Sequence, residues 1–205
     1  MNKSDLISQC EKSFGKNVRL KHLKKVLEGV SKIEKSVELG CREGWLIHNT
    51  SARKKVGYDL SPIRLFEDVD YIEQDILSLT PAHFDLVISS EVLEHIPDDR
   101  QTMKVMYGQL RAEGLIFLTT INSNIRKDKS EQDRRYGHIR RYGRELKILM
   151  ESTGFVTLDF YPMRSPHYYS CQRDLGRYSV EQDKIEGQEE ASGLVYIGRK
   201  LKDEF

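Results

Sequence analysis

Short apolar runs alternate with amphipathic stretches along this chain. Between residues 20 and 30, apolar side chains recur at helical spacing opposite lysines, which predicts a helix that covers the core. Seven short runs bounded mainly by Gly, Pro, Asp or Asn predict strands, at residues 36–39, 55–60, 70–76, 84–89, 114–121, 156–161 and 193–197. The chain therefore contains short strands with helical segments before and between them.

Two further helices are expected between the later strands. An acidic start at Asp98 and Asp99 precedes apolar residues at helical spacing, as at the positive end of a helix dipole. A second stripe begins at Leu146, and Gly154 can end that helix in the left-handed conformation. Strands alternating with helices imply a mainly parallel sheet with helices on both faces, the α/β class.

The length of 205 residues suits one domain spanning residues 1–205. Within it we expect an N-terminal helical cap at residues 1–34 and a long polar loop between the last two strands at residues 162–192. Lys and Arg number 33 and Asp and Glu 32, which excludes the strongly basic footprint of a dedicated duplex-nucleic-acid binder.

Cysteine usage and hydropathy indicate a cytoplasmic protein. The three cysteines are far apart and form no CxxC pair, which argues against a disulfide framework or a thiolate zinc site. The N-terminus lacks the apolar region of a signal peptide, and no apolar run is long enough to span a bilayer. We therefore expect no membrane insertion.

Acidic and glycine residues stand at the ends of successive predicted strands. The first strand leads into a glycine-bearing turn from Glu38 to Gly44, where a backbone can approach a ligand closely. Asp59 ends the second strand, nineteen positions after Gly40, where it can accept hydrogen bonds from ribose hydroxyls. Asp75, at the end of the third strand, can accept a hydrogen bond from an adenine amino group. Together these features indicate a nucleoside-containing cofactor.

These segments, in this order and spacing, resemble the class I methyltransferases of the methyltransferase 11, 12 and 23 group. The resemblance spans about residues 36–155 and includes the segment from Phe84 to Pro97 and the stretch His138-Ile139-Arg140-Arg141-Tyr142. It implies S-adenosylmethionine (SAM) as cofactor, and a Rossmann-like fold with a seven-stranded, mainly parallel sheet whose last strand is antiparallel.

The resemblance also assigns the cofactor site residue by residue. Glu38 takes the place of the family's acidic residue near the methionine amino group. Arg42 is a departure, because the family usually has glycine there; its side chain either lies outside the crevice in solvent or covers the methionine carboxylate. The predicted cofactor-binding residues are Glu38, Gly40, Cys41, Arg42, Gly44, Asp59, Leu60, Asp75, Ile76 and Ser90.

Glu91, His95 and His138 are the candidate catalytic residues. In Glu91-Val92-Leu93-Glu94-His95, a helical turn would place the two glutamates and the histidine on one face. With His138 this set resembles the metal site of small-RNA 2′-O-methyltransferases and of some ubiquinone-pathway O-methyltransferases, but no second histidine follows His138 closely. We expect no metal, in which case Glu91 and His95 line the pocket by hydrogen bonding and Glu94 supports a loop. The alternative is a metal site built from Glu91, Glu94, His95 and His138.

The acceptor is expected to be a small metabolite or a glycan or lipid precursor, methylated at oxygen or nitrogen. Residues 126–147 hold nine Lys and Arg against four acids, which favours an anionic acceptor or else forms a solvated loop. Alternatives are an RNA 2′-O-methyltransferase, a noncatalytic SAM-binding regulator, and an NAD-dependent oxidoreductase, whose GxGxxG spacing is missing here. The oligomeric state cannot be read from the residues.

Overall fold

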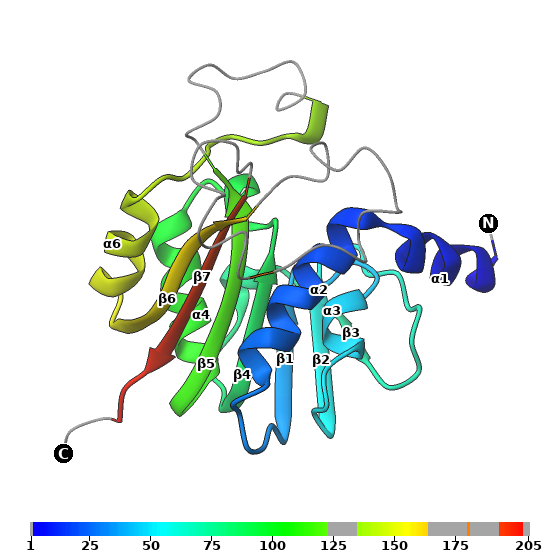
Figure 1. The fold of residues 1–205 in the computed structure, drawn as a ribbon, viewed down its shortest axis with the longest axis horizontal. Coiled ribbons are helices and arrows are strands. Elements are labelled where there is room, and N and C mark those ends of the chain that lie inside the picture. Colours follow the sequence, from blue (N-terminus) through cyan, green and yellow to red (C-terminus); the bar gives the residue numbers. More distant parts are fainter. Residues whose placement is uncertain (1, 123–134, 164–179, 181–192, 203–205) are drawn as a thin grey trace.

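The computed structural model describes residues 2–122, 135–163, 180 and 193–202. Its centre is a seven-stranded sheet in the order β3-β2-β1-β4-β5-β7-β6 (Figure 1). The strands are β1 (Lys35–Leu39), β2 (Lys54–Asp59), β3 (Asp70–Glu73), β4 (Phe84–Ser90), β5 (Leu110–Ile121), β6 (Phe155–Met163) and β7 (Gly193–Lys200). Only β7 runs antiparallel to its neighbours β5 and β6. The predicted fold class, including the antiparallel last strand, is confirmed.

Helices cover both faces of this sheet. They are α1 (Lys3–Lys12), α2 (Phe14–Leu27), α3 (Trp45–His48), α4 (Asp99–Gln109) and α6 (Glu145–Ser152), with short 3₁₀ turns η1 (Ile76–Ser78) and η2 (Leu93–His95). Leu23 of α2 packs in the core on one face, whereas Met106 of α4 and Leu146 of α6 belong to the core on the other. Figure 1 shows α2 in front of the sheet and α4 behind it.

Because both faces are covered, the middle of β4 is a continuous apolar run rather than an alternation of apolar and polar residues. In β4, Leu86 and Ile88 point into the core under α2, and Val87 points into the core under α4. All three side chains are fully buried. This double burial fixes β1 and β4 at the middle of the sheet, and their carboxyl ends border the site described below.

Several element boundaries differ from the sequence predictions. β2 ends at Asp59, so Leu60 lies outside the strand with 70% of its surface exposed. β3 ends at Glu73, and Ile76 instead begins η1, because the Asp75 carboxylate accepts the Leu77 N–H at 2.9 Å and turns the chain. The helix predicted at residues 20–30 starts earlier, at Phe14, where the Ser13 side chain caps it. Helix α1 lies within the N-terminal helical cap expected at residues 1–34, whereas helix α3 was not predicted.

Two predicted features lie largely outside the described residues. These are most of the loop predicted at residues 162–192 and residues 126–134 of the basic stretch. Within the part of the chain that the structure describes, no helix is both long and apolar enough to cross a membrane.

Candidate functional site

A cavity of about 490 Å³ opens at the carboxyl ends of β1, β2 and β4, where open α/β sheets bind ligands. The residues that line it are Lys16, Arg19, Glu38, Gly40, Cys41, Arg42, Glu43, Trp45, Leu46, Asp59, Leu60, Gln74, Asp75, Ile76, Ser90, Glu91, Val92, His95 and Ile96. All predicted cofactor-binding residues except Gly44 are among them. Of the candidate catalytic residues, Glu91 and His95 line the cavity and His138 does not.

The glycine turn after β1 needs glycine at both predicted positions. Gly40 has a φ of 77°, and a Cβ there would lie 2.3 Å from a methyl carbon of Val92. Gly44 has a φ of 71°, and a Cβ there would lie 2.8 Å from the Tyr71 hydroxyl. Side chains rarely adopt such backbone angles, and neither position has room for one. Gly44 therefore shapes the turn from behind without lining the cavity.

Glu38 is a buried carboxyl at the floor of the cavity. Its side chain accepts the Ile47 N–H at 3.1 Å, and only 4% of its surface is exposed. Burial raises the pKa of this carboxyl to about 8, an effect opposed by the Ile47 hydrogen bond and by the positive charge of Lys16. A ligand cation beside Glu38 would therefore provide the charge partner that favours its carboxylate form.

The two strand-end aspartates also organise their own turns. Asp59 accepts the Arg42 N–H at 2.9 Å through one carboxylate oxygen and the Ser61 N–H at 2.8 Å through the other. Asp75 caps η1 through Leu77. A carboxylate oxygen has two acceptor positions, so these bonds leave capacity for ribose or adenine donors.

The Arg42 side chain extends into solvent. It is 70% exposed, and its Nε lies 3.3 Å from a carboxylate oxygen of Glu43. The backbone of Arg42 has a φ of 44°, in the left-handed region where glycine is favoured. Of the two placements considered from the sequence, the solvated one matches this geometry.

Cations on α2 are site residues that the sequence analysis missed. Lys16 and Arg19 line the cavity, and Lys16 forms an ion pair with Glu43 of the glycine turn at 2.7 Å. This pair ties the N-terminal helix to the turn. Lysines and arginines along an amphipathic helix give no signal that separates a cavity lining from a solvated face, so tertiary packing alone reveals this role.

Glu91 and His95 meet at the cavity without sharing a helical face. Glu91 precedes η2 and has a φ of 57°, and its carboxylate accepts the Thr119 hydroxyl at 3.1 Å. His95 Nδ1 donates to the Gly137 carbonyl at 3.3 Å, and the ring centre of His138 lies 4.9 Å from that of His95. Burial and the nearby His138 lower the pKa of His95. The 3₁₀ turn η2 begins only at Leu93, so the shared helical face considered from the sequence does not form.

A second grouping brings Glu94 beside the two histidines. One potential ligand atom from each of Glu94, His95 and His138 lies within 4.8 Å of the others, and Glu91 is not part of this group. Glu94 is fully buried, and its Oε2 accepts the Thr120 hydroxyl at 2.8 Å. Its Oε1 has no hydrogen-bond partner among the residues described. Burial and the neighbouring Glu91 raise the pKa of Glu94. Two imidazoles and a carboxylate are a donor set that divalent transition metals accept.

A family model described as a methyltransferase domain matches residues 17–159, well over half of the chain. The chain belongs to this methyltransferase family. SAM is its cofactor, as expected from the resemblance. The matched segment contains the glycine turn, both strand-end aspartates and every candidate catalytic residue.

Curated relatives and solved structures agree with this membership. The methyltransferase chain is 30% identical over 123 residues to a ubiquinone biosynthesis O-methyltransferase of Nitrosomonas europaea, an alignment that covers 52% of each chain. It spans about half the length of this relative. A SAM-dependent methyltransferase of Mesorhizobium loti shares the fold with a TM-score of 0.66 at 18% identity, covering 89% of this chain and 98% of that one. The N-methyltransferase NodS of Bradyrhizobium japonicum with S-adenosylhomocysteine has a TM-score of 0.65 at 16% identity, covering 95% and 91%.

The site of this methyltransferase fits SAM in charge and shape. The buried Glu38 suits the ammonium group of the methionine portion, and Gly40, Cys41 and Arg42 of the glycine turn line the cavity. Asp59 and Asp75 stand at the cavity with spare acceptor capacity for the nucleoside. The cavity volume lies within the range of small-molecule and cofactor pockets.

Proposed function

We propose that this chain transfers a methyl group from SAM to a hydroxyl oxygen of a small metabolite, with a glycan or lipid precursor as the other acceptor class. SAM supplies a methyl group on a positively charged sulfur, so the protein has mainly to align the acceptor and remove its proton. Relatives of this chain are O-methyltransferases of ubiquinone biosynthesis, which supports an oxygen acceptor.

The observation that supports the proposal most strongly is the orientation of His95. Its Nδ1 donates to the Gly137 carbonyl, which leaves Nε2 as the unprotonated nitrogen of the neutral ring. His95 lines the cavity, so that nitrogen is suited to accept the proton of an acceptor hydroxyl. Glu91, which lines the cavity, and His138, which lies beside His95 outside the cavity lining, are then positioning groups.

The proposal also specifies the charge of the acceptor, which we expect to be negative. Arg19 lines the cavity and places positive charge near the acceptor. Some cations of the basic stretch are already engaged, because Arg140 pairs with Asp99 at 2.6 Å and Lys147 with Glu151 at 3.8 Å. Arg19 is therefore the better supported contact for an acceptor carboxylate or phosphate.

The test is S-adenosylhomocysteine formation by the purified chain with a panel of phenols, alcohols, amines and their phosphorylated or carboxylated forms. With an accepted hydroxyl compound, His95→Ala should lower kcat by about 100-fold or more and leave SAM affinity unchanged. His83→Ala, at an exposed position outside the cavity lining, is the matched control. Full activity of His95→Ala, or turnover with amines alone, contradicts the proposal.

A second candidate is metal-assisted transfer, including transfer to the 2′-hydroxyl of RNA. It is favoured by the grouping of Glu94, His95 and His138 and by Glu94 Oε1, which has no hydrogen-bond partner in the described part of the chain. A bound divalent cation would lower the pKa of an acceptor hydroxyl, and His95 would then be a ligand instead of a base. Activity that stops on chelation and returns with a divalent metal, tested on metabolites and on RNA termini, identifies this candidate.

A noncatalytic SAM-binding regulator is the remaining alternative. It predicts tight SAM binding without turnover on any member of the panel, with or without metal. The same binding and turnover measurements therefore separate all three candidates.

A further inference from the structure

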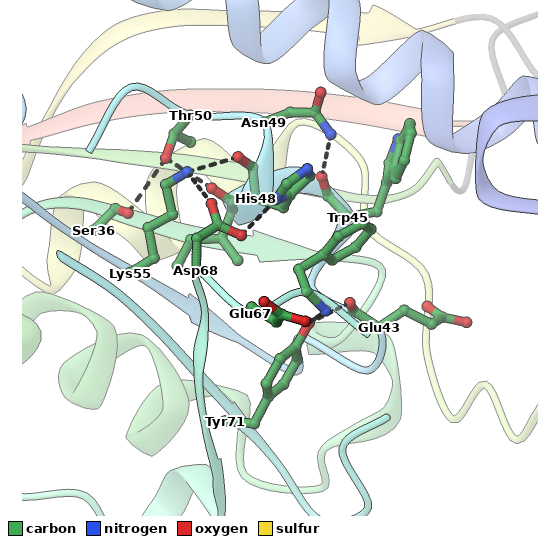
Figure 2. Close-up of polar contacts among 12 residues, drawn as sticks. Ser36, Glu43, Trp45, His48, Asn49, Thr50, Lys55, Glu67, Asp68 and Tyr71 are labelled. Carbon is green, nitrogen blue, oxygen red and sulfur yellow. Dashed lines mark hydrogen bonds and ion pairs between the residues drawn. The ribbon is translucent and has the colours of Figure 1, made fainter. Parts of the chain in front are cut away.

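Tyr71 lies behind the glycine turn, on the side away from the cavity. It belongs to β3, is 6% exposed, and is not among the residues that line the cavity. Its hydroxyl donates to the backbone carbonyl of Glu43 at 2.7 Å and accepts the Phe66 N–H at 3.2 Å. Figure 2 shows the Tyr71 hydroxyl directed at the Glu43 backbone. One hydroxyl group thus joins the turn after β1 to the connection between β2 and β3.

The contact with the turn is close as well as polar. A Cβ at Gly44 would lie 2.8 Å from the Tyr71 oxygen and 3.1 Å from a ring carbon, so the ring fills the space behind the Glu43–Gly44 peptide. Strand β3 also holds the β2–β3 connection, because the Arg64 side chain donates to the Tyr71 carbonyl at 2.9 Å. That connection reaches the turn a second time where the Ile63 N–H donates to the Arg42 carbonyl at 2.8 Å.

We propose that Tyr71 is a positioning residue of the SAM site, which holds the Glu43–Gly44 peptide in the conformation that receives the cofactor. The proposal depends on the placement of SAM in the cavity described above. Arg42, Glu43 and Trp45 line that cavity on either side of the Gly44 peptide. A shift of this peptide therefore moves three lining residues together.

Loss of the hydroxyl leaves the Glu43 carbonyl and the Phe66 N–H without this partner. The turn then samples other conformations in the free protein, and SAM binds only the competent one. The apparent Kd is the intrinsic Kd divided by the fraction of molecules in that conformation, so it rises as this fraction falls. The hydroxyl keeps its proton throughout the neutral range, because burial raises the pKa of Tyr71 to about 12. The contribution of Tyr71 should therefore be the same at pH 6 and pH 8.

The experiment measures SAM and S-adenosylhomocysteine affinity through the fluorescence of Trp45, the single tryptophan of the chain and a residue of the cavity wall. Tyr71→Phe should raise both Kd values by about three- to tenfold, as expected for the loss of a hydrogen bond between neutral groups. Tyr196→Phe is the matched control. Tyr196 is a fully buried tyrosine of β7 whose hydroxyl lies 3.1 Å from the Thr157 hydroxyl, and its loss should change Kd less than twofold.

A second variant tests the same contact from the turn. Gly44→Ala should also weaken SAM binding, and the double variant with Tyr71→Phe should lose less than the sum of the two effects, because the clashing hydroxyl is gone. Equal Kd values for wild type and Tyr71→Phe, with any loss confined to thermal stability as in Tyr196→Phe, overturn the inference. A wild-type chain that does not bind SAM overturns the placement of the cofactor instead.

Discussion

The backbone N–H of Arg42 donates a hydrogen bond to Asp59 Oδ2 at 2.9 Å, which joins the glycine turn to the end of β2. The carbonyl of Arg42 in turn accepts the Ile63 N–H at 2.8 Å. Held from both sides, Arg42 keeps a φ of 44°, a left-handed conformation that costs a residue with a Cβ about 1–2 kcal/mol. Asp59 therefore shapes the turn in addition to facing the nucleoside end of the cavity.

Asp59→Ala should weaken SAM binding by an order of magnitude or more. The change removes an acceptor for ribose hydroxyls, and a hydrogen bond to a charged group is worth about 1.5–3 kcal/mol. It also leaves the N–H groups of Arg42 and Ser61 without their acceptor. Isothermal titration calorimetry with S-adenosylhomocysteine measures the effect. Asp59→Asn, which retains one acceptor oxygen, should fold better and still bind weakly. Unchanged affinity in a folded variant contradicts the assignment of Asp59.

Arg42→Gly should leave SAM affinity within about twofold of wild type. The Arg42 side chain is 70% exposed and pairs only loosely with Glu43, and exposed ion pairs contribute little. Relief of the left-handed strain should stabilise the fold by up to about 1 kcal/mol, reduced by the greater freedom of glycine in the unfolded chain. Urea denaturation and a SAM titration measure both quantities. A tenfold loss of affinity would show instead that the arginine covers the methionine carboxylate.

SAM affinity should increase with pH between pH 6 and 7.5. In the free protein, burial holds the pKa of Glu38 at about 8, so this carboxyl is protonated over most of that range. A bound ammonium group favours the carboxylate, so binding lowers the pKa and releases a proton. Release of a proton makes binding tighter as pH rises, by up to about tenfold per pH unit. The range stays below the pH at which an α-amino group loses its own charge.

Glu38→Gln should bind SAM more weakly and remove this pH dependence. The same substitution reports on stability. The pKa of Glu38 in the folded protein is raised above its value in the unfolded chain. The contribution of this group to the free energy of unfolding is therefore complete below the ordinary carboxyl pKa and is lost as pH rises towards about 8. In that window the free energy of unfolding should fall by up to about 1.4 kcal/mol per pH unit more in wild type than in Glu38→Gln. Urea denaturation at several pH values measures this difference. A free energy of unfolding that changes equally with pH in the two proteins would refute the assignment.

The sheet was predictable from the sequence because its signals are local. The middle of β4, residues 86–88, is a continuous apolar run, and Asp98 and Asp99 mark the start of α4. The four-residue helix α3 was missed, since a single turn after Gly44 is too short to show a helical period. Leu60 and Ile76 were placed in strands because apolarity alone does not reveal where a neighbouring aspartate turns the backbone.

Some residues of the candidate site were also predictable from local sequence signals, and others were not. Residues at strand ends, such as Glu38 and Asp59, were predicted because a parallel sheet brings its carboxyl ends together. Arg19 and Tyr71 were not predicted, because they reach the site or its turn through packing between segments distant in the sequence. The proximity of His138 to His95 was expected from the resemblance, yet no spacing rule gives the Gly137 carbonyl that orients the His95 ring.

Gly40→Ala should destabilise the fold through Val92. The new Cβ would lie 2.3 Å from one Val92 methyl carbon and 3.1 Å from the other, and the φ of 77° adds its own strain. Overpacking of this kind costs about 1–3 kcal/mol, and the left-handed backbone about 1–2 kcal/mol more.

Val92→Ala removes both methyl carbons, so the double variant should recover the overpacking part of the loss and retain the backbone part. Urea denaturation of the two single variants and the double variant then gives a coupling free energy of about 1–3 kcal/mol. Strictly additive losses would show that Gly40 is required for its backbone angle alone, and that Val92 does not limit the space in the turn.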